Sequence, residues 1–208
     1  MSADAKSLVA AGYDEIAETY LRWTAGSPVR RLWLDAIAST LPPRARVLDL
    51  GCGAGVPVAR HLSHLGHRVV GVDGSRRQVA LAREAVPGGT FVVADMTTIA
   101  LAPASFDAVT AFYSITHVPR EEHESLIAKV LTWLRPGGVF LASLGCSDTP
   151  AWEGDWLGTD MFFSHFDDAA NRALVERAGF VIERAEIVGE RENGETVRFL
   201  WVIARKPW

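Results

Sequence analysis

The feature that most constrains the fold of this chain is an alternation of short apolar strands with amphipathic helices, which begins near residue 46. The strand-like segments are rich in β-branched residues, and the segments between them repeat apolar residues three and four positions apart. This alternation is typical of a parallel sheet covered by helices. Strands are expected at 46–50, 68–72, 91–94, 106–112 and 138–144, and helices at 57–66, 75–85 and 120–134.

The carboxyl-terminal part breaks this alternation. A helix expected at 171–180 is followed by two strand-like segments, 181–190 and 196–205, which are separated by a turn-rich stretch around Asn193 and Gly194. Two strands joined by so short a turn form a hairpin. The hairpin implies that one strand at the edge of the sheet runs antiparallel.

Two further segments lie outside the expected sheet. Helices at 12–23 and 28–40 precede it and are expected to form a helical cap over residues 1–40. Residues 145–166 are expected to form a long loop rich in Gly, Trp and Phe, and loops of this length are more often functional lids than slack connections. We therefore expect one domain over residues 1–208 that carries a cap and a substrate lid.

Charge and composition exclude several classes of partner. The net charge of −4 and the isoelectric point near 5.9 do not suit a protein that binds nucleic acid through a basic face. No signal peptide is recognisable, and no apolar run is long enough to cross a membrane. The two cysteines, Cys52 and Cys146, lie outside any CxxC pair and fit a reducing compartment. A cytoplasmic monomer or homodimer without nucleic-acid or membrane partners is expected.

Three histidines lie close together in the sequence, at His61, His64 and His67. The first two share a helix face, but His67 lies beyond Gly66, and no carboxylate or cysteine completes a ligand set nearby. A solvated helix end explains them, so no metal is expected.

The segment VLDLGCGAG (47–55) places three glycines after a strand and before a helix, which lets the backbone turn sharply and approach a ligand. A dinucleotide fingerprint requires a glycine at position 56, where this chain has Val56. In addition, Asp49 precedes the glycines and would repel a pyrophosphate, which also argues against a nicotinamide reductase. The loop therefore predicts a nucleoside that carries a positive group. A minor alternative makes Asp49 a plain acid near a helix dipole.

Two more acids follow the next strands. Asp73 ends the second strand, where an acid in such folds accepts hydrogen bonds from ribose hydroxyls, although it could instead cap the next helix, a role that Ser75 fills equally well. Asp95 follows the third strand and could accept an adenine amino group while Met96 packs on the ring. A ligand with adenine, ribose and a cationic amino-acid end is S-adenosylmethionine.

The order and spacing of VLDLGCGAG, GVDGS, VADM, FDAVTAFYSITHV and LRPGGVFLASL, over residues 46–144, resemble the class I S-adenosylmethionine-dependent methyltransferases. The resemblance implies an α/β fold with a doubly wound, seven-stranded, mostly parallel sheet whose last strand is antiparallel. It also implies that Asp49, Gly51 and Gly53 contact the methionine part of the cofactor and that two N-terminal tyrosines close over it. The expected cofactor-binding residues are Tyr13, Tyr20, Asp49, Gly51, Gly53, Asp73, Gly74, Ser75, Asp95, Met96 and Phe112.

The methyl acceptor is expected at the carboxyl edge of the sheet, where substrates gather in open α/β folds. His117 follows the fourth strand and could remove a proton from the acceptor, contact it, or satisfy a buried turn. The aromatic residues of 145–166 could line an acceptor pocket or form a satellite core. The expected substrate-binding residues are Tyr113, His117, Trp152, Trp156, Phe162 and His165, the last a weaker candidate for the same roles.

The sequence thus predicts methyl transfer to a small molecule. Amino-group methyltransferases of nucleic acids carry an Asn/Asp-Pro-Pro-aromatic motif after the fourth strand, whereas residues 111–114 here read AFYS. The alternatives are a protein that binds S-adenosylmethionine without catalysis and a methyltransferase that acts on a macromolecule. The acceptor atom stays open.

Overall fold

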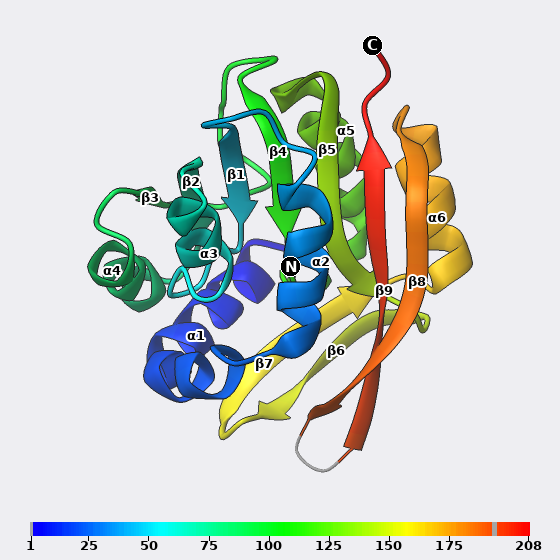
Figure 1. Cartoon of the computed structure of the whole chain (residues 1–208). Helices are drawn as coiled ribbons and strands as arrows, with labels where there is room; N and C mark the ends of the chain where they lie inside the picture. The colour runs from blue at the N-terminus through cyan, green and yellow to red at the C-terminus, as the bar shows by residue number, and fades with distance from the viewer. Residues whose placement is uncertain (1, 193–194) are drawn as a thin grey trace.

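The computed structural model describes residues 2–192 and 195–208 and contains a seven-stranded sheet in the order β3-β2-β1-β4-β5-β9-β8 (Figure 1). The strands are β1 Arg46–Leu50, β2 Arg68–Asp73, β3 Thr90–Val93, β4 Phe106–Ala111, β5 Leu134–Gly145, β8 Val181–Glu192 and β9 Glu195–Arg205. The first five pair in parallel, and β9 runs antiparallel to both β5 and β8. The expected sheet with an antiparallel last strand is confirmed. That strand lies one place inside the edge, which β8 forms, and the expected turn at Asn193 and Gly194 lies outside the described residues.

Helices cover both faces of the sheet (Figure 1). They are α1 Ser2–Thr24, α2 Pro28–Ala38, α3 Val58–His64, α4 Arg76–Ala85, α5 His123–Trp133 and α6 Asp168–Arg177, with 3-10 helices η1 Ile115–His117 and η2 Arg120–Glu122. Apolar side chains of α2, α3 and α4 form one buried cluster with one face of the sheet, and those of α5 and α6 form another with the opposite face. The doubly wound arrangement follows from this division of the core.

Residues 145–166 are not a loop, which corrects the expectation from the sequence. They hold β6 Thr149–Trp156 and β7 Thr159–His165, which pair as a separate antiparallel hairpin. Leu157 and Gly158 connect the two strands with φ of 58° and 85°, as a two-residue type I′ turn requires. Because β6 is mostly exposed, it lacks the regular apolar alternation by which strands are recognised.

Among the other elements, two starts differ most from expectation. Helix α1 begins at Ser2 rather than at residue 12, because the preceding segment, rich in alanine, continues the helix over the carboxyl edge of the sheet. Strand β5 begins at Leu134 rather than at residue 138, because Leu134 already pairs with Phe106 of β4.

The arrangement leaves the carboxyl ends of β1 to β4 facing α1, and β7 packs against α1 from the other side (Figure 1). Within the described part of the chain, no helix combines the length and apolarity that crossing a membrane requires.

Candidate active site

A cavity of about 510 Å³ lies where the carboxyl ends of β1 to β4 meet α1. The residues that line it from the sheet come from the segments 51–53, 73–75, 93–98 and 112–118. Every residue expected to bind the cofactor lines this cavity except Asp49. Asp49 lines a smaller cavity of about 30 Å³ whose wall shares Gly51 and Gly53 with the large one. The site residues expected after four separate strands are therefore brought together.

The glycine loop is held tightly against the neighbouring strands. The amides of Gly51 and Cys52 both donate to the carbonyl of Val72, at 2.8 and 3.1 Å. Gly51 has a φ of 68°, and a Cβ at this position would lie 2.2 Å from the Cβ of Ser114. Only glycine fits here, because any side chain would push the loop away from the end of β4.

Asp49 is a buried carboxyl group with one free oxygen. Its side chain is 1% exposed, Oδ1 accepts a hydrogen bond from Thr110 Oγ1 at 2.7 Å, and Oδ2 has no partner among the described residues. Burial raises the pKa of Asp49 to about 7, and the Thr110 hydrogen bond opposes that rise. An oxygen without a donor beside the glycine loop fits a ligand cation, such as the ammonium group of S-adenosylmethionine. The alternative role near a helix dipole loses support because α3 begins only at Val58.

Asp73 joins the glycine loop to the start of α4. Its Oδ2 accepts the Gly53 amide at 2.8 Å and its Oδ1 accepts the Ser75 amide at 2.9 Å. Ser75 is the N-cap of α4, because its Oγ accepts the Gln78 amide, so the capping role belongs to Ser75. Each Asp73 oxygen keeps a lone pair for a ligand hydroxyl.

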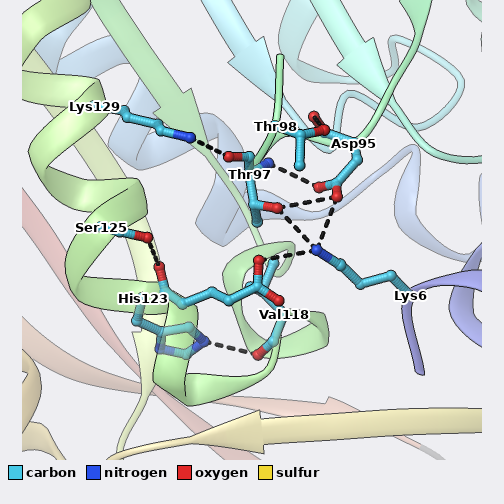
Figure 2. A network of polar contacts seen from close by, with 9 residues as sticks. Lys6, Asp95, Thr97, Thr98, Val118, His123, Ser125 and Lys129 are labelled. Atoms are coloured by element: carbon cyan, nitrogen blue, oxygen red, sulfur yellow. Dashed lines mark hydrogen bonds and ion pairs between the residues drawn. The ribbon is translucent and has the colours of Figure 1, made fainter. Parts of the chain in front are cut away.

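Asp95 is held by a network that also includes Lys6 of α1 (Figure 2). Lys6 Nζ lies 2.8 Å from Asp95 Oδ2, 2.9 Å from Glu122 Oε2 and 2.9 Å from Thr97 Oγ1, while the Thr97 amide donates to Asp95 Oδ1 at 2.8 Å. Lys129 of α5 donates to the Thr97 carbonyl. Partial burial raises the pKa of Asp95, but the hydrogen bonds with Lys6 and Thr97 outweigh it and hold the pKa below its ordinary value. The network fastens the amino-terminal part of α1 over the Asp95 end of the cavity.

His117 is buried at 7% exposure in η1 and is bonded through both ring nitrogens. Nδ1 lies 2.8 Å from the carbonyl oxygen of Phe162, which can only accept, so Nδ1 carries the proton. Nε2 is then an acceptor for the phenol of Tyr13 at 2.9 Å. Burial lowers the pKa of His117 to about 4, although the bond to Phe162 opposes the shift. The imidazole is therefore neutral at pH 7, with its basic nitrogen toward α1.

Comparisons with known proteins agree with this geometry. Residues 47–138 match the family model of the methyltransferase domain. The chain is 31% identical over 158 residues to the malonyl-[acyl-carrier protein] O-methyltransferase of Enterobacter lignolyticus, across 74% of this chain and 61% of that protein. It is 38% identical over 100 residues to the trans-aconitate 2-methyltransferase of Variovorax paradoxus, across 48% of this chain and 38% of that protein. The chain thus spans less than two thirds of these curated relatives.

The fold has a matching solved structure. The 1,6-didemethyltoxoflavin-N1-methyltransferase of Burkholderia thailandensis, solved with 1,6-didemethyltoxoflavin and S-adenosylhomocysteine, superposes with a TM-score of 0.78 and 20% identity. The superposition covers 100% of this chain and 91% of that one. The chain thus matches the methyltransferase domain family over residues 47–138, and its fold is that of this solved methyltransferase.

The β6–β7 hairpin packs against α1 through aromatic rings. The ring of Trp156 lies 6.0 Å from those of Tyr13 and Tyr20, 6.1 Å from that of Trp23 and 6.4 Å from that of His117, measured between centroids. Thr159 Oγ1 of β7 also donates to Glu15 of α1 at 2.8 Å. We call α1 and the β6–β7 hairpin together the cover.

Only some of the residues expected to bind the substrate line the large cavity. Tyr113 and His117 line the large cavity, and Phe162 reaches the site through its carbonyl bond to His117. The remaining expected residues do not line the cavity: Trp152, Trp156, Phe162 and His165. Trp152 is 42% exposed and its ring contacts Phe163, while His165 Nδ1 bonds the carbonyl of Ser147 at 2.7 Å. Within residues 2–192 and 195–208, no group of three His, Cys, Asp or Glu side chains could hold a metal ion.

Sequence reasoning missed Lys6, Thr97 and Arg30. Lys6 lies in a segment with no periodic signal, and its partners are far away in the sequence. Arg30, buried on α2, lines the small cavity beside Asp49. A charged residue on the inner side of an expected helix was the only available signal for Arg30.

Proposed function

We propose that this protein uses S-adenosylmethionine to methylate a small-molecule acceptor. The observation that carries the proposal is the free, buried Oδ2 of Asp49 beside the glycine loop, with Asp73 and Asp95 following along the same sheet edge. These three acids suit the ammonium, ribose and adenine parts of one ligand. S-adenosylmethionine, when bound, supplies a methyl group bonded to a sulfonium, and the group that leaves on transfer is a neutral thioether.

The residues of this chain then have two tasks, which are to hold the acceptor in line and to exclude water. Gly51 and Gly53 let the backbone approach the ligand, and Asp73 fixes their loop through the Gly53 amide. The cover suits the exclusion of water, since α1 lines the cavity with Val9, Tyr13 and Tyr20 and is itself packed against the hairpin through Trp156.

His117 is the candidate base for acceptors that must lose a proton. Its Nδ1–H is fixed by the Phe162 carbonyl, so Nε2 is the nitrogen free to receive a proton. In the structure that position is taken by the Tyr13 hydroxyl, which lines the same cavity. An acceptor hydroxyl or acid could displace Tyr13 from Nε2 or pass its proton through the phenol. An acceptor that is already deprotonated needs neither residue.

A small acceptor suits the covered site better than a polymer does. A polymer requires an open groove, whereas α1 lines the cavity here and is packed against the hairpin through the rings of Tyr13 and Trp156. The relatives reported above carry names that include trans-aconitate, malonyl-[acyl-carrier protein] and 1,6-didemethyltoxoflavin, two small molecules and one carrier-bound acid. The acceptor atom differs among them by name, so it does not transfer to this chain.

The test is methyl transfer from labelled S-adenosylmethionine to a panel of phenols, amines and carboxylic acids, with carrier-bound acids and RNA as further arms. We expect transfer to at least one small acceptor, and a strong loss of transfer in Asp49→Asn. Binding of S-adenosylhomocysteine without transfer to any acceptor would favour a non-catalytic binding protein. Transfer to RNA or carrier-bound acids alone would overturn the assignment to small molecules.

A further inference from the structure

Arg30 is a buried guanidinium group with few partners. Its side chain is 8% exposed, Nη2 donates to Tyr20 Oη at 3.0 Å, and the Cζ atom lies 4.5 Å from the centroid of the Tyr113 ring. In the described ranges of the chain, no ion pair includes Arg30. Arginine is seldom buried without a paired anion, because removing the charge from water is costly. The guanidinium of Arg30 is thus suited to a ligand that carries an anionic group.

Glu190 of β8 contacts the residues around Arg30 but forms no ion pair with it among the described residues. Glu190 accepts hydrogen bonds from Ser27 Oγ at 2.9 Å and from the Tyr113 hydroxyl, so its carboxylate is already engaged on the far end of the Tyr113 side chain. The Tyr113 ring in turn stacks under the guanidinium. Arg30 Cζ also lies 5.8 Å from the centroid of the Tyr20 ring. Two aromatic contacts and one hydrogen bond therefore hold Arg30 in place and occupy only one of its five N–H donors among the described residues.

The carboxyl group of Asp49 lines the same small cavity as Arg30. Asp49 Oδ2 is buried without a donor, and Asp49 and Arg30 share this cavity with Gly51 and Gly53. The two side chains do not form an ion pair with one another, although the charge of Arg30 opposes the burial that raises the pKa of Asp49. The fold keeps a buried carboxyl group and a buried guanidinium near each other but apart. A ligand group that complements them must carry both charges a short distance apart.

We propose that Arg30 binds the carboxylate of the cofactor's amino-acid end, opposite Asp49, which takes the ammonium group. The inference rests on the proposed function and assigns the zwitterion of the methionine part to one residue pair. Arg30 and Asp49 would together select ligands that carry an intact α-amino acid group over nucleosides that lack it. The guanidinium is suited to this because its planar fork can hold a carboxylate through two bonds.

The competing occupant of Arg30 is an anionic methyl acceptor. Tyr113, on which Arg30 stacks, also lines the large cavity with His117, so an acceptor carboxylate could reach Arg30 from that side. The methionine part is favoured because Arg30 lines the cavity of Asp49 and the glycine loop, and not the wall that contains His117.

The test compares two ligands that differ only in the amino-acid end. Calorimetry should measure S-adenosylhomocysteine and 5′-methylthioadenosine on the wild type, Arg30→Gln, Arg30→Lys and the control Arg31→Gln. Arg31 is the adjacent arginine, is 64% exposed and pairs with Asp35 on the surface. We expect Arg30→Gln to weaken S-adenosylhomocysteine roughly tenfold or more, which corresponds to one charge-assisted bond. Arg30→Lys should weaken it less, and Arg31→Gln should change neither ligand.

Affinity for 5′-methylthioadenosine should stay within about twofold of the wild type in every variant. Equal weakening of both ligands in Arg30→Gln would assign Arg30 a merely structural role. Unchanged S-adenosylhomocysteine affinity with a raised KM for the acceptor would assign Arg30 to the acceptor and leave the proposed function standing. A wild type that binds neither nucleoside would overturn the proposed function together with this inference.

A ligand-side measurement covers the case in which Arg30→Gln does not fold. On the wild type, decarboxylated S-adenosylhomocysteine should bind roughly tenfold or more weakly than the parent compound. On Arg30→Lys the difference between these two ligands should shrink. Equal affinities of the two ligands on the wild type would contradict the assignment without any variant.

Discussion

Tyr13 and His117 are hydrogen-bonded to each other, with 2.9 Å between the phenol oxygen and Nε2. Tyr13 belongs to α1, and His117 lies in η1 directly after β4. The second ring nitrogen of His117 bonds the Phe162 carbonyl of β7 at 2.8 Å. One imidazole therefore joins the sheet, the amino-terminal helix and the hairpin at the wall of the cavity. Displacing the cover would break a bond of the proposed base.

The first prediction removes the Tyr13 hydroxyl. Tyr13→Phe keeps the ring that packs on Trp156 but leaves Nε2 of His117 buried without a donor, which costs about 1–3 kcal/mol of stability. We expect a lower free energy of unfolding and a roughly tenfold or larger fall in kcat for an acceptor that must lose a proton. Binding of S-adenosylhomocysteine should change by much less.

Chemical denaturation and steady-state kinetics check this prediction. Acceptors of different acidity provide the control, because an acceptor that is already ionised needs no base. If Tyr13→Phe slowed ionised and protonated acceptors equally, the bond to His117 would matter for packing and not for proton transfer.

The cofactor side of the site was largely predictable from the sequence. The glycine loop, Asp73 and Asp95 are specified locally, because a strand end, a tight turn and a helix start each have short-range signals. The structure brings these segments together since parallel strands all end at one edge. The family's residue order therefore carried most of the information.

The cover and its charges were not predictable in the same way. Lys6 meets Asp95 and Glu122 only after folding, and Arg30 meets Tyr113 only because α2 packs beside the end of β4. Strand β6 pairs with β7 outside the main sheet and stays exposed, so it leaves no periodic apolar pattern in the sequence. Tertiary contacts determine the positions of Lys6, Arg30 and β6, whereas local sequence signals determine the glycine loop and the acids at the strand ends.

The second prediction separates the two roles of Asp73. Asp73→Ala removes the acceptor for the Gly53 and Ser75 amides and also the acceptor proposed for ribose hydroxyls. We expect weaker binding of S-adenosylhomocysteine, by roughly 1.5–3 kcal/mol for each charge-assisted bond lost. A 2′,3′-dideoxy analogue isolates the hydroxyl contribution. It should bind the wild type far more weakly than the parent ligand does, and the two should bind Asp73→Ala alike. A wild type that did not distinguish the two ligands would leave Asp73 as a loop residue only.

The third prediction concerns pH and Asp49. Burial raises the pKa of Asp49 to about 7 in the folded chain, from an ordinary value of 3.8. The stability that the protonated form contributes is complete below the ordinary pKa and is lost as pH rises through about 7. Asp49→Asn avoids this loss, so its free energy of unfolding should exceed that of the wild type increasingly from about pH 4 to about pH 7 and by a constant amount above that. The difference should be on the order of 4 kcal/mol at most.

Ligand binding should show the opposite trend. The ammonium of S-adenosylhomocysteine requires an ionised Asp49, so wild-type affinity should rise between pH 6 and 8, and Asp49→Asn should bind weakly with little pH dependence. Unfolding curves and calorimetry at several pH values measure both trends. If the stability and the affinity of the wild type both rose with pH, Asp49 would not be a buried carboxyl group that ionises to bind the ligand ammonium.

The last prediction is that the cover opens to admit the acceptor. Trp156 contacts Tyr13, Tyr20 and His117, and Gly12 lets α1 approach β7 so closely that an added Cβ would lie 2.9 Å from the Asp160 carbonyl oxygen. These contacts join the hairpin to α1, whose Tyr13 and Tyr20 line the cavity, and nothing larger than a water molecule passes a packed aromatic interface without moving it. Hydrogen exchange in residues 12–23 and 149–165 should therefore slow when S-adenosylhomocysteine and the acceptor bind together.

Trp156→Ala should reduce acceptor turnover more than cofactor affinity, because it loosens the cover while leaving the acids of the sheet edge intact. Trp152→Ala offers a matched comparison on the same hairpin, since this ring is 42% exposed and contacts Phe163 instead of α1. We expect Trp152→Ala to retain most turnover. Equal protection of both segments with and without ligands, or equal turnover in the two tryptophan variants, would make the cover a fixed part of the core and would require another route for the acceptor.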